Sequence, residues 1–160
     1  MDHQITVLDR SAMAATVLGT PVGDEIVLSV TGWSMMPLLF SRRSVVYLKR
    51  VGRYAPRKGD IVLFRRLDGS FVLHRVHKVE KSGFLTINGD AQIWTESILP
   101  IQVLATVTHF VRRTRDVSVD DFGYRLYSAL WCPLRFLHPL GARFVYYWHR
   151  VPEKLFGKKS

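Results

Sequence analysis

The sequence predicts a mainly β domain followed by a helical tail, and three observations lead to this prediction. Short runs of branched apolar residues recur between residues 25 and 111, separated by Gly, Pro, Asn and Asp. After Arg115 the composition changes to an aromatic-rich segment. The length of 160 residues suits one domain with an appendage. We therefore divide the chain into a β domain over 1–115 and a tail over 116–160.

The β domain is expected to begin with a short helix. Apolar residues between Ile5 and Leu18 fit a helical period loosely, and a Gly-Thr-Pro sequence follows, so a helix is predicted over about 5–19. Strands are predicted in the branched or aromatic runs 25–31, 44–51, 61–66, 71–78, 84–87 and 101–111. Short strands at this spacing indicate an all-β sheet or a partly closed barrel.

A hairpin is predicted at the Asp-Gly pair 68–69, because both central positions of a two-residue loop need positive φ. That loop would place Leu63 opposite His74 and Asp60 opposite His77. Strand alternation would form one face from Val72, His74 and Val76, and the other from Phe71, Leu73, Arg75 and His77. Neither face is cleanly polar, so we expect both to be covered.

The net charge of +10, from 23 Lys and Arg against 13 Asp and Glu, predicts an anionic partner. Nucleic acid and an acidic lipid surface both satisfy this condition. Cys132 is the only cysteine, which excludes an intrachain disulfide and a cysteine-based metal site. No uncharged apolar run is long enough to cross a bilayer, and the N-terminus lacks the pattern of a cleaved export signal. We expect neither a spanning helix nor such a signal.

The tail favours the lipid surface. Residues 124–150 are rich in aromatic side chains, namely Tyr124, Tyr127, Trp131, Phe136, Phe144, Tyr146, Tyr147 and Trp148. Interleaved Arg and His residues argue against a spanning helix, whereas Trp and Tyr beside Arg suit a membrane interface. Pro133 and Pro139 should divide the stretch into short helices. The alternative is an aromatic-rich helix that packs against the β domain.

Ser34 is the candidate nucleophile, because it follows the end of a predicted strand and precedes Pro37. A serine hydroxyl needs a neighbouring base to take its proton. The lysines near the sheet lie in polar or turn contexts, where a charged amine is expected. His74 lies in the middle of a strand and has an ordinary pKa near neutrality, so it is the best-placed base. A buried histidine bonded to the backbone is the structural alternative.

Asp90 is the candidate third member, because a carboxylate can hold an imidazole in one tautomer. A turn aspartate bonded to its own backbone is the alternative for Asp90, and it is the preferred interpretation of Asp60. His74 and His77 should point to opposite faces of their strand and therefore cannot share a metal ion. We expect no metal and no organic cofactor.

Four short blocks resemble, in order and spacing, those of type I signal peptidases. They are 32–37 (Gly-Trp-Ser-Met-Met-Pro), 58–62 (Lys-Gly-Asp-Ile-Val), 72–76 (Val-Leu-His-Arg-Val) and 85–90 (Leu-Thr-Ile-Asn-Gly-Asp). The likeness is strongest to the endoplasmic-reticulum type, in which histidine replaces the lysine base. The whole chain is also similar to compact, membrane-associated signal-peptidase-like proteins of Bacteroidetes.

The resemblance implies a signal-peptidase/LexA-like β-barrel or coiled sheet. It also implies Ser34 as nucleophile, His74 as general base and Asp90 as supporting acid, with support for the serine from Gly32, Met35 and Pro37. The backbone amide of Ser34 would belong to the oxyanion hole. The substrate would be an extended peptide with small residues before the scissile bond, paired with a strand edge. The implied location is peripheral, on a bacterial inner membrane.

The sequence departs from the family at Asn88, where lysine is usual, and at 91–92 (Ala-Gln), where asparagines are usual. Family members are also tethered by a spanning anchor, which is not expected here. The leading hypothesis is a serine endopeptidase at a membrane surface. A LexA-type self-cleaving regulator shares the fold but uses a lysine base. A non-catalytic module that binds a membrane or partner is a further alternative. Nucleic-acid binding is not expected, because the tail aromatics alternate with long aliphatic residues, and the oligomeric state is left open.

Overall fold

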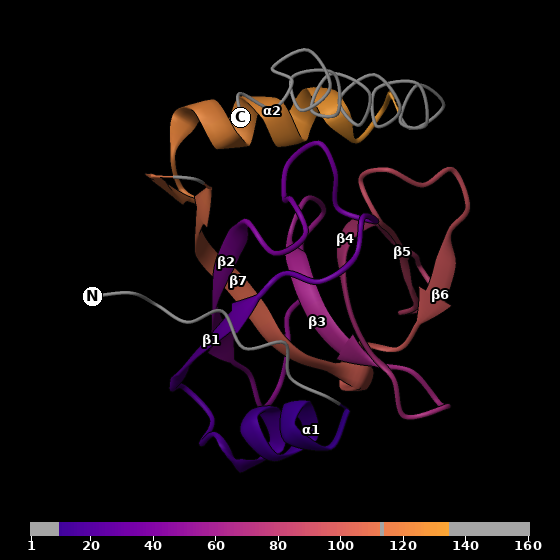
Figure 1. The fold of residues 1–160 in the computed structure, drawn as a ribbon. Coiled ribbons are helices and arrows are strands. Elements are labelled where there is room, and N and C mark those ends of the chain that lie inside the picture. The colour runs from indigo at the N-terminus through magenta and orange to yellow at the C-terminus, as the bar shows by residue number, and fades with distance from the viewer. Residues whose placement is uncertain (1–9, 113, 135–160) are drawn as a thin grey trace, which may run out of the picture.

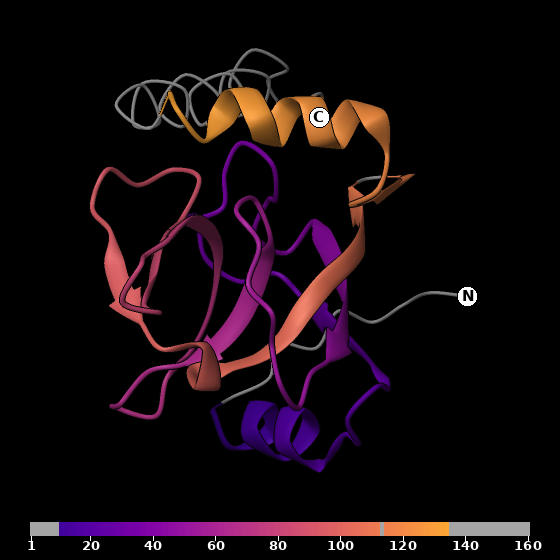
Figure 2. The same cartoon turned by 180° about the vertical axis from the view of Figure 1, so that it is seen from behind.

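A single antiparallel sheet forms the body of the protein, with one helix at either end of it (Figures 1 and 2). The computed structural model describes residues 10–112 and 114–134. The strands are β1 (Glu25–Ser29), β2 (Ser44–Arg50), β3 (Ile61–Arg65), β4 (Phe71–Val79), β5 (Leu85–Asn88), β6 (Glu96–Ile98), β7 (Val103–Arg112) and β8 (Arg115–Ser118). The helices are α1 (Arg10–Gly19) and α2 (Phe122–Trp131), and a 3₁₀ turn spans Pro100–Gln102.

The strand order is β1-β2-β7-β3-β4-β5-β6, with β8 paired to β7. One edge of β7 pairs with β2, while the other edge is shared by β3 and β8. The prediction of a mainly β fold is confirmed, and each of the six predicted strands is present. The sheet does not close into a barrel. Two strands were missed, because β6 is only three residues long and β8 begins at Arg115, where the composition changes.

β3 is buried on both faces and separates two hydrophobic cores. Ile61 and Leu63 pack in a first core with side chains of α1, β1, β2 and β7. Val62 and Phe64 pack in a second core with side chains of β4, β5, β6 and β7. An uninterrupted apolar run is the pattern expected of a strand covered on both sides. The neighbouring strand β4 therefore also faces both cores, as its mixed composition predicted.

The register of the β3–β4 hairpin differs by one residue from the prediction. Val62 pairs with His74, and Leu63 pairs with Leu73 instead of His74. Val76, rather than His77, bonds to the carbonyl oxygen of Asp60. The cause is the loop, in which the Arg66 amide donates to the Ser70 carbonyl oxygen (2.9 Å) and three residues, not two, lie between them.

Gly69 supplies the positive φ of this three-residue loop, at +84°. The Asp68 carboxylate accepts bonds from the Ser70 amide (2.8 Å) and hydroxyl (2.6 Å). A turn followed by a left-handed glycine is the usual form of three-residue hairpins. A change of register does not alter the order of side chains along a strand, so the alternation of β4 side chains is as predicted. Val72 and Val76 contact the second core, and Phe71 and Leu73 contact the first.

The structure describes most of the predicted N-terminal helix but only the first part of the predicted C-terminal tail. The N-terminal helix is confirmed over Arg10–Gly19, and its predicted first turn lies outside the described residues. The predicted tail begins inside β8, which pairs with β7. Within α2, Tyr124 and Ser128 are buried, so this part packs on the sheet. The prediction for 135–150 lies outside the described residues.

Within the part of the chain that the structure describes, no helix is both long enough and apolar enough to span a bilayer.

Replacing Gly69 with alanine should destabilise the protein by about 1–2 kcal/mol, because an L-residue is strained at positive φ. A matched control is Gly123→Ala in α2, where a Cβ meets nothing within 4 Å and φ is not positive. We expect the control to be neutral or slightly stabilising. Urea unfolding of both variants measures the difference. Equal stabilities for the two variants would contradict the loop conformation described here.

Candidate active site

Ser34 lies in a turn that leads out of β1 and is anchored by buried apolar side chains. Gly32 starts the turn at φ +93°, a conformation that other residues rarely adopt. Met35 is almost fully buried, at 2 % exposure, and its carbonyl oxygen accepts a bond from the Leu39 amide (2.9 Å). Ser34 itself is half-buried. The turn therefore holds the serine at the surface while its neighbours enter the first core.

The loop after β5 packs directly against Ser34. The Ala91 amide donates to the Ser34 carbonyl oxygen (2.8 Å). A Cβ on Gly89 would lie 2.4 Å from that oxygen and 2.9 Å from Ser34 Cβ. Only glycine permits so close an approach of two backbone segments. The Gly-Asp block and the serine block, which are far apart in sequence, are thus in contact.

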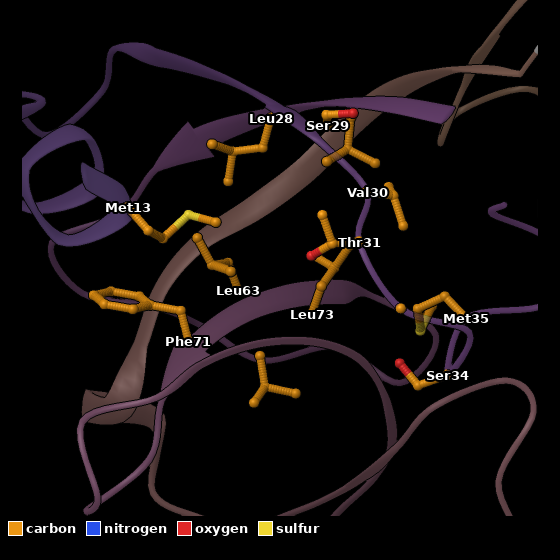
Figure 3. Close-up of a pocket in the computed structure, with 13 residues that line it drawn as sticks. Met13, Leu28, Ser29, Val30, Thr31, Ser34, Met35, Leu63, Phe71 and Leu73 are labelled. Atoms are coloured by element: carbon orange, nitrogen blue, oxygen red, sulfur yellow. The ribbon is translucent and has the colours of Figure 1, made fainter. Parts of the chain in front are cut away.

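Ser34 also borders a cavity of about 150 Å³ (Figure 3). One side of the cavity is formed by the end of β1 and the segment after it, from Leu28 to Gly32, and the other side by β4 residues 71–73. Figure 3 shows Ser34 at one end of the cavity, with its hydroxyl directed inward. The lining is largely aliphatic, with contributions from Met13, Leu63 and Leu73.

Among the described residues, the two strands beside this cavity each have an edge without a strand partner. β1 is the first strand in the sheet order, so β2 occupies only one of its edges. β4 pairs with β3 from Phe71 to Arg75 but pairs with β5 only from Arg75 onward. Residues 71–74 therefore have one edge without a strand partner. Unpaired edges of this kind can accept an added strand.

His74 is 2 % exposed and contacts the second core, where its ring lies 6.1 Å from that of Phe64. Burial lowers the pKa of His74 to about 4, against the opposing effect of the Glu96 carboxylate. The imidazole is therefore neutral at pH 7. Its Nδ1 atom has no hydrogen-bond partner and lies 3.6 Å from Glu96 Oε1. The structural alternative, a histidine bonded to the backbone, is therefore not observed at Nδ1.

Glu96, in β6, is the carboxylate that faces His74, and sequence reasoning missed it. It forms a bidentate ion pair with Arg66, in which Arg66 Nε lies 2.7 Å from Glu96 Oε2. This pair lowers the pKa of Glu96, which is therefore ionised at neutral pH. The only sequence signal was a single acid six residues after Asp90, within a segment with no strand pattern.

Asp90 is not placed on the histidine. Its carboxylate accepts two bonds from Arg75, from Nε to Oδ1 and from Nη2 to Oδ2, each 2.7 Å long. Both side chains are fully buried. The predicted contact of Asp90 with the imidazole is therefore absent, because the neighbouring guanidinium occupies both carboxylate oxygens. Asp60 bonds Tyr54 OH (2.5 Å) and the Arg57 amide (3.2 Å), as expected of a turn aspartate.

The structure brings Ser34 next to Gly89 and Ala91, and Ser34 and Leu73, the residue before His74, line the same cavity. Ser34 Oγ and His74 share no hydrogen bond. The Ser34 amide likewise makes no hydrogen bond to any residue that the structure describes. Over the same ranges, no group of three or more His, Cys, Asp or Glu side chains could hold a metal ion.

No protein-family model, curated protein or solved structure gives a significant match to this chain.

The lowered pKa of His74 predicts a pH-dependent stability. The unfolded chain, in which the pKa of this histidine is near 6.5, binds its proton first as the pH falls. The contribution is therefore complete above pH 6.5 and is lost as the pH falls toward 4. Urea unfolding should show that wild type loses about 2–3 kcal/mol more than His74→Gln between pH 7 and pH 4. Parallel losses in the two proteins would contradict the burial of a neutral imidazole.

Proposed function

We propose that this protein is a serine endopeptidase resembling a signal peptidase, acting at a membrane surface with Ser34 as nucleophile and His74 as general base. The observation that carries the proposal is the placement of Ser34 Oγ at the end of a cavity between two strand edges that have no strand partner among residues 10–112 and 114–134. A signal-peptidase/LexA-like sheet is part of the same proposal. It rests on the four sequence blocks and on the contact between the first and the last of them.

The proposed reaction begins with transfer of the Ser34 hydroxyl proton to His74 as the serine attacks the peptide carbonyl carbon. His74 suits this role because it is neutral at pH 7. Glu96 can accept a bond from Nδ1–H and stabilise the imidazolium, which leaves Nε2 as the base. We assign this supporting role to Glu96 instead of Asp90. Catalytic hydrogen bonds are often long before substrate binds, so Ser34 and His74 need not be bonded beforehand.

The tetrahedral intermediate would carry its negative charge on the former carbonyl oxygen. The Ser34 amide is the proposed donor to that oxygen, since it has no other partner among the described residues. Collapse of the intermediate expels the amine, which takes the proton from His74. Water then hydrolyses the ester on Ser34 by the same base.

The proposed substrate is an extended peptide that adds a strand beside β1 and β4. Main-chain bonds to a sheet edge would supply affinity, and side-chain pockets would supply specificity. The small size and aliphatic lining of the cavity suit the small residues that the resemblance implies before the scissile bond. Two exposed tryptophans are found in these segments. Trp33, 56 % exposed, precedes Ser34 in sequence, and Trp94, 60 % exposed, lies in the β5–β6 loop.

An anionic membrane surface is the proposed partner of α2. Four exposed apolar residues follow one another at intervals of four along and just beyond this helix: Phe122, Leu126, Leu130 and Leu134. This spacing places them on one face, opposite the buried Tyr124 and Ser128. An apolar stripe on a chain of net charge +10 suits an interface with acidic lipid. Peripheral association of this kind needs no spanning helix.

Cleavage of a membrane-presented peptide with small residues before the bond should be abolished by Ser34→Ala and nearly abolished by His74→Ala. The physical reason is the loss of the nucleophile or of its base. Product formation is measured by mass spectrometry. Turnover that persists in Ser34→Ala would exclude the mechanism, and a folded wild type without any turnover would favour the non-catalytic binding module.

The assignment of the supporting acid is tested with Glu96→Gln, which keeps the size of the side chain and removes its charge. We expect a fall in kcat of about 10²-fold or more, with little change in KM. Glu80→Gln is the matched control, because Glu80 is bonded to Lys78 and Thr86 away from His74. An unaffected kcat in Glu96→Gln would remove Glu96 from the site.

The double variant Leu126→Ser/Leu130→Ser should bind anionic vesicles at least about tenfold more weakly than wild type, because it removes apolar area from the exposed stripe. Leu67→Ser is the control: Leu67 is 99 % exposed, in the β3–β4 hairpin at the end of the sheet away from α2 (Figure 1). Vesicle sedimentation measures the binding. Equal binding of all three proteins would refute the role of α2.

A further inference from the structure

The inward face of α2 converges on Arg75 and Asp90. Arg75 Nη1 donates to Tyr124 OH (3.0 Å) and to Ser128 Oγ (2.9 Å). The Trp131 indole N–H donates to the Asp90 carbonyl oxygen (3.2 Å), and Tyr127 OH approaches the Asp90 carboxylate (3.5 Å). One helix thus supplies contacts to both members of a fully buried ion pair.

Both members of the pair are adjacent in sequence to the proposed catalytic residues. Arg75 directly follows His74 in β4. Asp90 lies between Gly89, which abuts Ser34, and Ala91, whose amide bonds the Ser34 carbonyl oxygen. The two charge-assisted bonds between Arg75 and Asp90 therefore connect the strand of the base to the loop that supports the nucleophile.

The helix reaches the site indirectly, through its contacts with this pair, with the Asp90 carbonyl oxygen and with the first core. Among the described residues, none from α2 borders the cavity at Ser34. The same Nη1 atom also donates to the Gly59 carbonyl oxygen (3.0 Å). Removing the two hydroxyls of α2 would leave the Gly59 carbonyl oxygen as the one acceptor of Nη1 among the described residues, so the guanidinium would shift or lose hydrogen bonds.

We propose that Tyr124, Ser128 and Trp131 are positioning residues for the peptidase site, an inference that rests on the proposed function. They hold the Arg75–Asp90 pair in the one arrangement that keeps Ser34 and His74 in register. The outward face of the same helix carries the apolar stripe, so the surface proposed to meet lipid and the contacts that order the site belong to one rigid element.

The first test is kinetic and uses the double variant Tyr124→Phe/Ser128→Ala in the full chain. Each change removes only a hydroxyl that accepts a bond from Arg75. We expect kcat for the membrane-presented peptide to fall about tenfold to a hundredfold, with KM within about twofold of wild type. The matched control, Tyr47→Phe/Ser82→Ala, makes the same chemical changes at a ring stacked on His109 and at an exposed turn. It should keep the wild-type kcat.

The second test does not depend on catalysis. Amide hydrogen exchange measured by NMR compares Ala91, bonded to the Ser34 carbonyl oxygen, with Val51, bonded to the Leu104 carbonyl oxygen (2.9 Å). The double variant should speed exchange at Ala91 about tenfold relative to Val51. Trp131→Phe, which keeps the ring stack on Tyr127 and loses the indole donor, should have a smaller effect in the same direction.

Equal acceleration at Ala91 and Val51 would mean that the helix only stabilises the whole fold, and it would overturn the inference. Wild-type kcat in the double variant would overturn it as well. If wild type shows no turnover while the selective effect at Ala91 is present, the proposed function fails and the positioning role of α2 stands.

Discussion

The buried ion pair between Arg75 and Asp90 is the interaction on which the arrangement of this protein depends. Removing water from two charges costs several kcal/mol per ion, and only close pairing with further hydrogen bonds offsets that cost. Burial by itself would lower the pKa of Arg75. The Asp90 carboxylate has the larger, opposite effect, and the pKa of Arg75 is raised above its usual value. Loss of either partner would leave a buried charge that costs about 3–5 kcal/mol. β4, the loop after β5 and α2 must therefore meet at one place.

The position of the site follows from the way the sheet divides the interior. β3 sends alternate side chains into two cores, and β4 beside it does the same. Leu73 consequently reaches the cavity at Ser34, while His74 turns toward Phe64 and Glu96. The site lies at the boundary of the two cores, where β4 has not yet gained its second strand partner. The same boundary keeps the imidazole away from water.

The environment of His74 and the two faces of α2 are the physical features that support the proposed function. Burial favours the neutral imidazole, and the Glu96 carboxylate, held by Arg66, favours the charged one. A base needs this combination, because it must be unprotonated before the reaction and stabilised once it has taken a proton. On α2, the polar face meets the ion pair and the apolar face meets solvent. A membrane that covers the apolar face would remove the free-energy cost of exposing these apolar side chains to water.

Local patterns in the sequence determined six of the eight strands that the structure describes and the alternation along β4, because burial of apolar residues at a period of two needs no knowledge of distant contacts. They did not determine the hairpin register, since Asp68-Gly69 fits both a two-residue and a three-residue loop and only the bond between Arg66 and Ser70 decides. They also left the partners of the charged groups open. Arg75 is adjacent to Asp90 only across the β4–β5 pairing, and Glu96 meets His74 only through the short strand β6. Which carboxylate lies beside the histidine was therefore decided by tertiary structure, in which the Arg75 guanidinium pairs with Asp90.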